Sequence, residues 1–355
     1  MEKCLYPVES VSLSPILSDN PFMEENRITI KDIAEELGVS TATVSNVLHG
    51  KKGKVSRKTI EKVEAAIERH RYIPSMAALL LGRNDSRIVG VVINDHEKYH
   101  DRVLEDGFVS ASLNALCRKL EEKGLFMMVK TTRDISEIPK YASMWNMDAL
   151  VLIGFCDSDY SSIRRESRIP FVVYDGVCSV EGDGIAMLTV DDRKGGLLAG
   201  AYLKNLGHSN VLCLTDNRER MDEARCCAVM EKVGKGEEML IPMDKDQRWA
   251  LYSSRLDYIR SFSSVFAISD YYALDFISFL NTEGISVPKD ISVIGFDGTM
   301  QASFFSLTTI EQDHMMRAEM AVKSLEEFAE GVNESRVKIV DVKLREGNTV
   351  KRLCD

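Results

Sequence analysis

The chain reads Ile-Lys-Asp-Ile-Ala-Glu-Glu-Leu-Gly-Val-Ser-Thr-Ala-Thr-Val-Ser-Asn-Val-Leu over residues 30–48. Two short helical patterns flank the Gly-Val-Ser at its centre. Ala34 is small enough to let the two helices cross closely, Gly38 can take the left-handed turn between them, and Ser40 can cap the second helix. This stretch therefore predicts a helix-turn-helix.

A third helical pattern follows from Ser56 to His70, with Ser56 as its cap, and Pro74 ends it. Three short helices make a compact domain, which we place at residues 27–73. Residues 27–83 hold 11 Lys+Arg and 6 Asp+Glu, a net charge of +5 within a protein of net charge -10. A basic module on an acidic body indicates a unit that binds a polyanion.

The composition places limits on the class of protein. The 355 residues are 45% hydrophobic and 28% charged, which is typical of a folded chain of two or three domains. The longest apolar runs, Ile88 to Ile93 and Met76 to Leu81, are far shorter than the ~20 residues of a membrane span, and no secretory signal is readable. We therefore expect a cytoplasmic protein with no membrane partner and with its 8 cysteines reduced.

Enzyme motifs are missing from the sequence. It contains no Gly-x-Ser-x-Gly elbow, no Walker A loop, no His-Glu-x-x-His and no metal-spaced Cys/His cluster. We therefore expect that the protein is not an enzyme and holds neither a metal ion nor a cofactor.

From residue 88 onward, short apolar or β-branched runs alternate with helical patterns. This rhythm predicts two α/β halves with parallel sheets. Ligands of such sheets bind at the carboxyl ends of the strands, and paired lobes place those ends at the cleft between them. The expected strands are Ile88–Ile93, Phe126–Lys130, Ala149–Ile153 and Phe171–Tyr174, then Asn210–Leu214, Met239–Ile241, Val265–Ile268 and Ile291–Phe296.

Two segments lie outside these domains. Residues 1–26 mix polar and scattered apolar residues without a period, so we expect a mobile extension, and Met23 is an alternative start. Residues 74–87 join the basic domain to the α/β body, and Met76 to Leu81 can form about two helical turns, as expected of a hinge.

The basic domain resembles that of the lactose-repressor (LacI) family of bacterial transcription regulators. The resemblance extends from residue 28 to about 350. It is carried by Thr29-Ile30-Lys31-Asp32-Ile33-Ala34, Gly38-Val39-Ser40, Thr43-Val44-Ser45, Tyr72-Ile73-Pro74, Ile88-Val89-Gly90-Val91, Gly207-His208, Asp290-Ile291-Ser292-Val293-Ile294-Gly295-Phe296-Asp297 and Leu307-Thr308-Thr309-Ile310.

The resemblance implies that the second helix, Thr41 to Leu48, enters the major groove of DNA. Thr41, Ala42 and Asn46 match base-reading positions of the family, and Asn46 can pair bidentately with adenine. Basic side chains around the next loop would contact phosphates, and a hinge leucine would wedge into the minor groove. The predicted DNA contacts are Thr41, Ala42, Thr43, Ser45, Asn46, His49, Lys51, Lys52, Lys54, Lys58 and Leu81.

The resemblance also implies that residues 88–355 form a two-lobed α/β sensor domain of the periplasmic-binding-protein type, behind a hinge helix. The chain is expected to cross between the lobes near residues 189, 311 and 338. The first lobe then comprises about 88–189 and 312–338, and the second about 190–311 and 339–350. Effector contacts carried over are Asp175, Arg220, Asp270, Asp297 and Gln312, and Trp249 could stack on a sugar.

These features predict a homodimeric, sequence-specific transcription regulator that represses its genes. Its partners would be double-stranded, palindromic operator DNA and a small polar effector, such as a sugar, bound between the lobes. Two alternatives stay open: a small-molecule receptor of the periplasmic-binding-protein type, and a regulator without effector response. Residues 345–355 contain no leucine heptads, so we expect no tetramerising coiled coil.

Overall fold

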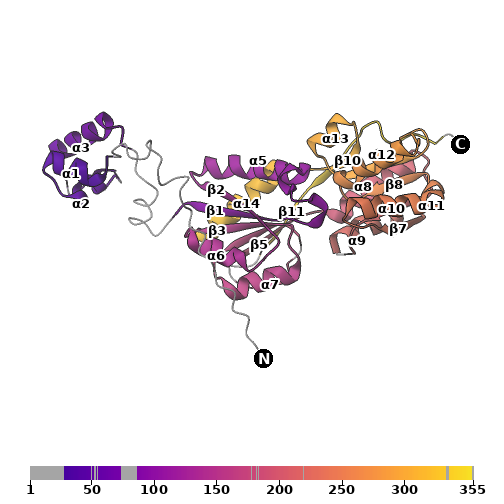
Figure 1. Cartoon of the computed structure of the whole chain (residues 1–355), viewed down its shortest axis with the longest axis horizontal. Coiled ribbons are helices and arrows are strands. Elements are labelled where there is room, and N and C mark those ends of the chain that lie inside the picture. The colour runs from indigo at the N-terminus through magenta and orange to yellow at the C-terminus, as the bar shows by residue number, and fades with distance from the viewer. Residues whose placement is uncertain are drawn as a thin grey trace, which may run out of the picture. The chain divides into compact units, whose positions relative to one another are not determined.

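The computed structural model describes residues 28–72 and 86–353, apart from 49, 52, 54, 177, 181, 183, 219 and 333–335. The chain divides into two compact units, Met1–Asn84 and Asp85–Asp355 (Figure 1). The expected extension and nearly all of the expected hinge lie outside the described residues. Within the described part of the chain, no helix is long and apolar enough to cross a membrane.

The first unit contains the three predicted helices, α1 (Ile30–Leu37), α2 (Thr41–Leu48) and α3 (Arg57–Arg69). A capping box begins α1, because the Thr29 side chain accepts from the Asp32 N–H while Asp32 accepts from the Thr29 N–H at 2.7 Å. Gly38, with φ 63°, ends α1 in the left-handed region. The three helices share one apolar core, built from Ile33, Ala34, Val44, Val47, Val63 and Ala66.

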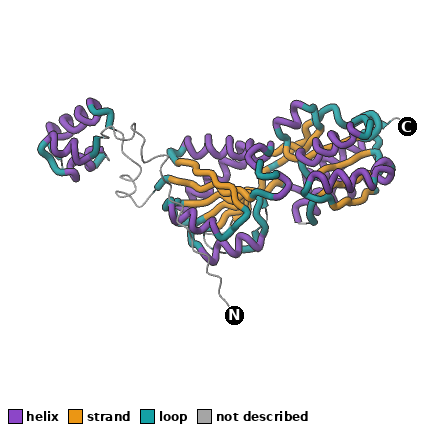
Figure 2. Tube along the Cα trace, viewed as in Figure 1, coloured by secondary structure: helices purple, strands orange, loops and turns teal. Residues whose placement is uncertain are grey.

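The second unit begins with a lobe, here lobe 1, built on a six-stranded parallel sheet of order β11-β5-β4-β3-β1-β2. Its strands are β1 (Ile88–Asn94), β2 (Phe126–Thr132), β3 (Ala149–Ile153), β4 (Phe171–Asp175), β5 (Ile185–Val190) and β11 (Arg336–Val340). Nearly continuous apolar runs in the central strands fit a sheet covered on both faces. The helices α5 (Gly107–Glu122) and α14 (His314–Ala329) pack on one face, and α6 (Glu137–Met144) and α7 (Asp157–Glu166) on the other (Figure 2).

The other half of the unit, lobe 2, repeats this plan with sheet order β12-β10-β9-β8-β6-β7, in which only β12 is antiparallel to its neighbour. Its strands are β6 (Val211–Thr215), β7 (Gly236–Leu240), β8 (Ser264–Ala267), β9 (Ser292–Asp297), β10 (Thr308–Gln312) and β12 (Val342–Arg345). Its helices are α8 (Asp192–Asn205), α9 (Arg220–Val233), α10 (Lys245–Ser254), α11 (Leu256–Arg260), α12 (Asp270–Thr282) and α13 (Met300–Phe304).

The chain passes between the lobes three times. It leaves lobe 1 between β5 and α8 at residue 191, returns between β10 and α14 at residue 313, and leaves again between β11 and β12 at residue 341. These points lie two or three residues beyond the positions 189, 311 and 338 expected from the sequence. Because the carboxyl ends of β5, β10 and β11 all lead to crossings, the ends of both sheets meet at the junction of the lobes.

Glycines bring α8 and α9 of lobe 2 unusually close together. A Cβ on Gly200 would lie 2.7 Å from the carbonyl oxygen of Val229, and one on Gly196 would collide with the carbonyl oxygen of Arg225. The absence of side chains at these two positions lets α9 lie directly against α8. This contact sets where Arg225 stands at the junction of the lobes.

Candidate functional site

The predicted DNA-reading helix α2 presents a polar face beside an apolar one. Thr41 and Ala42 are exposed, and Thr43, Ser45 and Asn46 are half-buried, while Val44 and Val47 face the core of the unit. The Ser40 side chain accepts from the Thr43 N–H at 3.1 Å, which caps α2 as expected.

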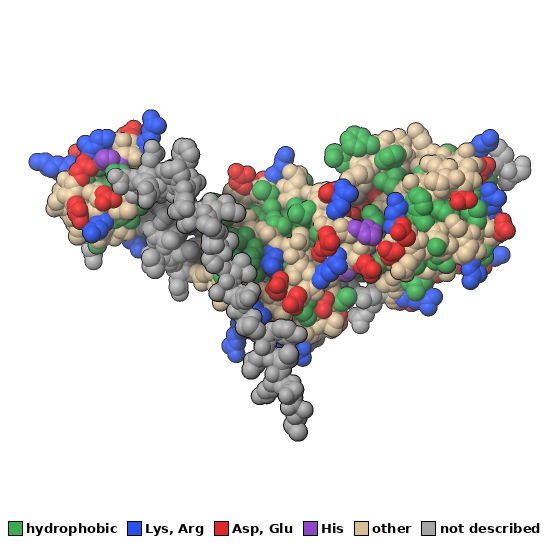
Figure 3. All heavy atoms as spheres, in the orientation of Figure 1, with side chains coloured by type: hydrophobic (Ala, Val, Ile, Leu, Met, Phe, Trp, Pro, Cys, Tyr) green, Lys and Arg blue, Asp and Glu red, His purple; other side chains and the backbone are tan. Residues whose placement is uncertain are grey.

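The structure describes some of the basic side chains that are expected to contact phosphate. Lys51 and Lys58 are exposed, and Lys and Arg side chains mark the surface of this unit in Figure 3. Glu36 joins α1 to the end of α3 through Arg69 and through His70, whose Nε2 lies 2.6 Å from the Glu36 carboxylate. The remaining expected contacts, His49, Lys52, Lys54 and Leu81, lie outside the described residues.

The second unit contains a cavity of about 460 Å³ between its lobes, at the carboxyl ends of the strands of both sheets. This volume lies within the range of small-molecule sites. Lobe 1 contributes His96, Lys98, Tyr99, Asp106, Phe108, Asp157 and Asp175, among others, and lobe 2 contributes Asp216, Asn217, Arg218, Asp222, Arg225, Tyr271 and Asp297.

Arg225 is the best-anchored cation of the cavity. It is 7% exposed, its Nε donates to Asp192 at 2.7 Å, and its Nη1 donates to the carbonyl oxygen of Ile268 at 2.9 Å. The guanidinium carbon also lies over the ring of Phe296, 3.8 Å from the ring centroid. These contacts fix the guanidinium in one orientation, as a site for fork-like recognition of a ligand requires.

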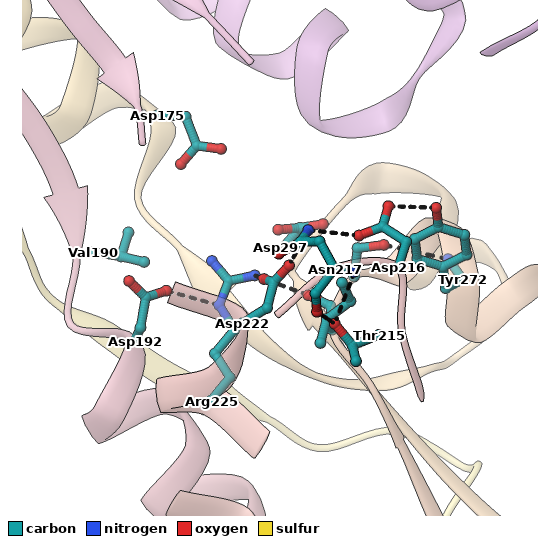
Figure 4. Close-up of polar contacts among 12 residues, drawn as sticks. Asp175, Val190, Asp192, Thr215, Asp216, Asn217, Asp222, Arg225, Tyr272 and Asp297 are labelled. Carbon is teal, nitrogen blue, oxygen red and sulfur yellow. Dashed lines mark hydrogen bonds and ion pairs between the residues drawn. The ribbon is translucent and has the colours of Figure 1, made fainter. Parts of the chain in front are cut away.

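Two linked carboxylates lie beside Arg225 in lobe 2. The Asn217 amide donates to Asp216 at 2.8 Å and to Asp222 at 2.7 Å, and Tyr272 donates to Asp216 at 2.5 Å (Figure 4). Burial raises the pKa of Asp222 to about 6, against the lowering effect of Arg225. The carboxylates are thus held in place by neutral donors as well as by cations.

A loop of lobe 1 reaches across to lobe 2 on one side of the cavity. It includes the 3₁₀ turn η2 (Glu97–Tyr99), and the Lys98 ammonium lies 3.7 Å from Asp216. The Tyr271 hydroxyl donates to the Lys98 carbonyl oxygen at 2.9 Å, and the rings of Tyr99 and Tyr271 meet edge to face. This side of the cavity therefore depends on the arrangement of the two lobes.

Of the effector contacts expected from the sequence, Asp175 and Asp297 line the cavity. Asp175 ends β4 and accepts from Arg317 at 3.2 Å, and Asp297 ends β9 with φ 125°, a conformation rare for a residue with a side chain. Gln312 lies behind the cavity wall and donates to Asp297 at 2.8 Å.

Asp270 also lies behind the wall. It is 1% exposed and accepts from the Thr299 N–H at 2.7 Å and from the Thr309 hydroxyl at 2.5 Å. Its carboxylate therefore holds the β9–α13 loop and β10 together, and its backbone N–H donates to Asp297.

Trp249 does not fit the expected stacking role, because it is not among the residues that line the cavity. Its indole N–H donates to Asp275 at 3.0 Å, and its ring packs edge to face on Phe279. Arg220 begins α9, but its side chain lies outside the described part of the structure.

Sequence reasoning missed Lys98, Asp216, Asp222 and Arg225. Arg225 lies on the same helix as the expected Arg220, and the signal that could have found it is Gly196, whose missing side chain admits the backbone of Arg225. Lys98 had no comparable signal, because it lies in a loop that no periodic pattern covers.

Comparisons with known proteins identify the family. Residues 29–75 match the bacterial regulatory proteins of the lacI family, and residues 201–350 match a periplasmic binding protein-like domain. The HTH-type transcriptional repressor PurR of Vibrio atlanticus is 30% identical over 349 residues, which cover 92% of this chain and 99% of the relative. The chain belongs to the lacI family. The regulator MalR of Clostridium butyricum is 25% identical over 90% of this chain and 98% of its own length.

Solved structures of transcription regulators share the fold. A lac repressor dimer bound to operator and the anti-inducer ONPF matches with a TM-score of 0.75 at 21% identity, over 91% of this chain and 99% of that one. The regulator CelR in complex with cellobiose matches with a TM-score of 0.66 at 21% identity, over 91% of this chain and 100% of that one. The predicted family, fold class and role as a DNA-binding regulator are confirmed.

Proposed function

We propose that this LacI-family regulator represses transcription as a homodimer on a palindromic operator, and that a small polyhydroxylated effector in the interlobe cavity sets its affinity for DNA. The observation that carries this proposal is the cavity itself. It is formed by the strand ends of both lobes, it has the volume of a small-molecule site, and its wall combines fixed carboxylates, an anchored guanidinium and aromatic rings.

The polar groups of the cavity suit hydroxyl groups. Asp175 and Asp297 can each accept from a hydroxyl, and the guanidinium of Arg225 can donate to an oxygen. The rings of Tyr99, Phe108 and Tyr271 offer apolar surface for the faces of a sugar ring. The similarity to a regulator solved with cellobiose supports a sugar as the class of effector.

Control of DNA binding follows from the two-lobed construction. An effector can change operator affinity only if it binds one arrangement of the lobes more tightly than another. The loop that carries Lys98 and Tyr99 contacts lobe 2 at Asp216 and Tyr271, so a ligand in the cavity acts directly on contacts that differ between lobe arrangements.

A homodimer is supported by apolar side chains left exposed on both lobes. In lobe 1 these lie on β2 and at the end of α6, and in lobe 2 they lie on α13 and just after it, where Figure 3 shows an apolar cluster. Patches of this kind mark interfaces between proteins, and a dimer would present two copies of α2 to the two halves of a palindrome. We call this set the dimer surface: Phe126, Val129, Met144, Trp145, Met300, Phe304 and Phe305.

We further propose that the protein acts in the cytoplasm and by binding alone, without catalysis. Two buried arginines are engaged in structural contacts, Arg225 with Asp192 and Arg248 with Asp275 at 2.8 Å. Binding of DNA, of the effector and of a second subunit is sufficient for such a regulator.

The test couples an effector search to DNA binding. Purified full-length protein is screened by thermal shift against sugars, amino sugars and nucleosides, and each hit is titrated against operator DNA by fluorescence anisotropy. We expect the affinity of Arg225→Lys for the effector to fall at least tenfold, since lysine cannot reproduce the guanidinium contacts, while its affinity for DNA without effector stays unchanged. Arg193→Lys, on the exposed face of α8, is the matched control, since lysine there can keep the ion pair with Glu231. An unchanged effector response in Arg225→Lys would contradict the proposal.

A further inference from the structure

The interlobe cavity carries more negative than positive groups. Six aspartates line it, Asp106, Asp157, Asp175, Asp216, Asp222 and Asp297, against three cations, Lys98, Arg218 and Arg225. Neutral sugars need acceptors and donors but no excess charge. The binding of hydroxyl groups alone therefore does not explain the excess of carboxylates.

Each of the three cations is already engaged with a carboxylate of the protein. Arg225 pairs with Asp192 at 2.7 Å and lies 3.8 Å from Asp222, Lys98 lies 3.7 Å from Asp216, and Arg218 turns to Glu238 at 2.9 Å. Of the other carboxylates, Asp175 pairs with Arg317 at 3.2 Å, behind the lining, and no cation of the lining is left for the rest.

Two lining carboxylates, Asp297 and Asp106, have no cation within 4 Å among the residues that the structure describes. Asp297 is 7% exposed and accepts from the Gln312 amide at 2.8 Å and from the Asp270 N–H at 3.4 Å. Within the described part of the chain, Asp106 accepts from the N–H groups of Phe108 and Val109, in the first turn of α5, at 3.0 Å each. A buried carboxylate with neutral donors alone is costly, and a cation would stabilise it.

The surroundings of Asp297 are negative as well as buried. Burial raises its pKa and the neighbouring Asp270 raises it further; Arg225 lowers it, and Asp106 and Asp175 add smaller raising effects. A positive charge placed in the cavity near Asp297 would interact favourably with all of these carboxylates at once.

The protein itself shows how the cavity holds an ammonium group. The Lys98 ammonium lies 5.1 Å from the ring centroid of Tyr99 and 5.4 Å from that of Tyr272, beside Asp216. Burial opposes the charge of Lys98, yet Tyr99, Tyr272 and Asp216 together raise its pKa above its ordinary value. The combination of aromatic faces and carboxylates is the one that suits an organic cation.

We infer that the effector carries a protonated amine on a small polyhydroxylated ring, as in an amino sugar, with the ammonium beside Asp297 and the hydroxyl groups toward Asp175 and Arg225. This inference rests on the proposed function of the cavity. A metal ion fits less well, because no group of three metal-ligating side chains among the described residues is placed to hold one, and the aromatic rings favour an organic ligand.

The experiment compares matched ligands on the full-length protein at pH 7 by isothermal titration calorimetry. Glucosamine, galactosamine and mannosamine are each compared with the parent hexose, which has a hydroxyl in place of the amine, and with the N-acetyl derivative, which has a neutral amide. We expect at least one amine to bind at least tenfold more tightly than both of its neutral counterparts.

Two variants locate the effect. Asp297→Asn keeps the shape of the side chain and removes its charge. In this variant the amine should bind about as tightly as its neutral counterparts, while circular dichroism shows a folded protein. Asp257→Asn, on the exposed surface of α11, should keep the full preference.

Three outcomes would overturn the inference: hexoses that bind as tightly as their amines, a preference for the amine that Asp297→Asn leaves unchanged, or no binding of any of the three amines. A neutral hexose that binds as tightly as its amine would overturn the inference alone and would support the proposed function.

Discussion

At the scale of single residues, the carboxylates of the interlobe cavity couple stability to pH. Asp222 has its pKa raised to about 6 by burial, from an ordinary value of 3.8. The native protein therefore binds this proton more tightly than the unfolded chain. The resulting stabilisation is complete below pH 3.8 and is lost as the pH rises through about 6.

We therefore expect the difference in melting temperature between Asp222→Asn and the parent to change with pH. Raising the pH from 5 to 7 should destabilise the parent more than the variant, because the asparagine has no proton to lose. Thermal unfolding followed by circular dichroism at pH 5, 6 and 7 measures this difference, with Asp257→Asn as a surface control. Parallel pH profiles for Asp222→Asn and the parent would show that Asp222 does not titrate in this range.

A substitution of Asn46 on α2 can distinguish the recognition of bases from electrostatic attraction to the DNA backbone. Asn46 is half-buried at the edge of the exposed polar face, and an asparagine there can pair bidentately with adenine. Asn46→Ala should cost roughly 1 to 3 kcal/mol on the cognate operator and relax the preference at one base position, whereas Lys51→Ala should weaken all sequences alike and reduce the salt slope. Fluorescence anisotropy on the operator and on single-base variants distinguishes the two. Equal losses on every sequence for both variants would remove Asn46 from base readout.

At the scale of elements, local patterns predicted the helices of the first unit closely. The bounds of α1 and α2 match those expected, and Ser56 and His70 stand as the caps of α3. In the second unit, eight strands were expected and four were missed: β5, β10, β11 and β12. Three of these lead into the crossings between the lobes. Charged or hydroxyl side chains interrupt the apolar pattern of β10, β11 and β12, whereas β5 is an apolar run, Ile-Ala-Met-Leu-Thr-Val, that the sequence analysis overlooked.

The residues of the cavity could be predicted from the sequence only in part. Asp175 and Asp297 end strands whose apolar runs are plain in the sequence, so their place at the strand ends follows from the pattern. The sequence analysis expected Arg220, at the start of α9, to contact the effector. The arginine that lines the cavity is Arg225, farther along the same helix and against α8. Which side of a helix faces a cavity depends on tertiary packing, here on the contact of α9 with Gly196 and Gly200. The sequence of α9 alone does not indicate which of its faces lines the cavity.

The close contact between α8 and α9 makes a prediction at this scale. Gly196→Val adds a branched side chain where even a Cβ would collide with the backbone of Arg225, so α9 must move outward. We expect a loss of effector affinity of at least tenfold together with a lower melting temperature, since the guanidinium shifts away from Asp192. Gly234→Ala, after the end of α9 with no atom within 4 Å of its added Cβ, is a control for stability loss through backbone strain. Unchanged effector affinity in Gly196→Val would show that this packing does not position Arg225.

At the scale of the whole molecule, repression depends on assembly as well as on the two binding surfaces. One copy of α2 is a short helix with few base contacts, and a palindromic operator gains its affinity from two copies held together. The proposed dimer surface includes residues of both lobes, so a change in the arrangement of the lobes would also change the interface between subunits. On this proposal, effector binding, assembly and operator affinity are linked through the arrangement of the lobes.

The double variant Trp145→Glu, Phe305→Glu tests this link. These side chains are 47% and 68% exposed in the single chain, so charges there cost little in the monomer but would be buried without partners in a dimer. We expect light scattering with size-exclusion chromatography to show monomers at micromolar concentration, and operator affinity to fall at least a hundredfold, while binding of effector to the isolated cavity persists. Leu240→Glu, on the exposed edge strand β7 at 49% exposure, is the matched control and should remain dimeric. A double variant that stays dimeric would place the interface elsewhere, whereas a monomer with undiminished operator affinity would show that a single copy of α2 suffices for binding.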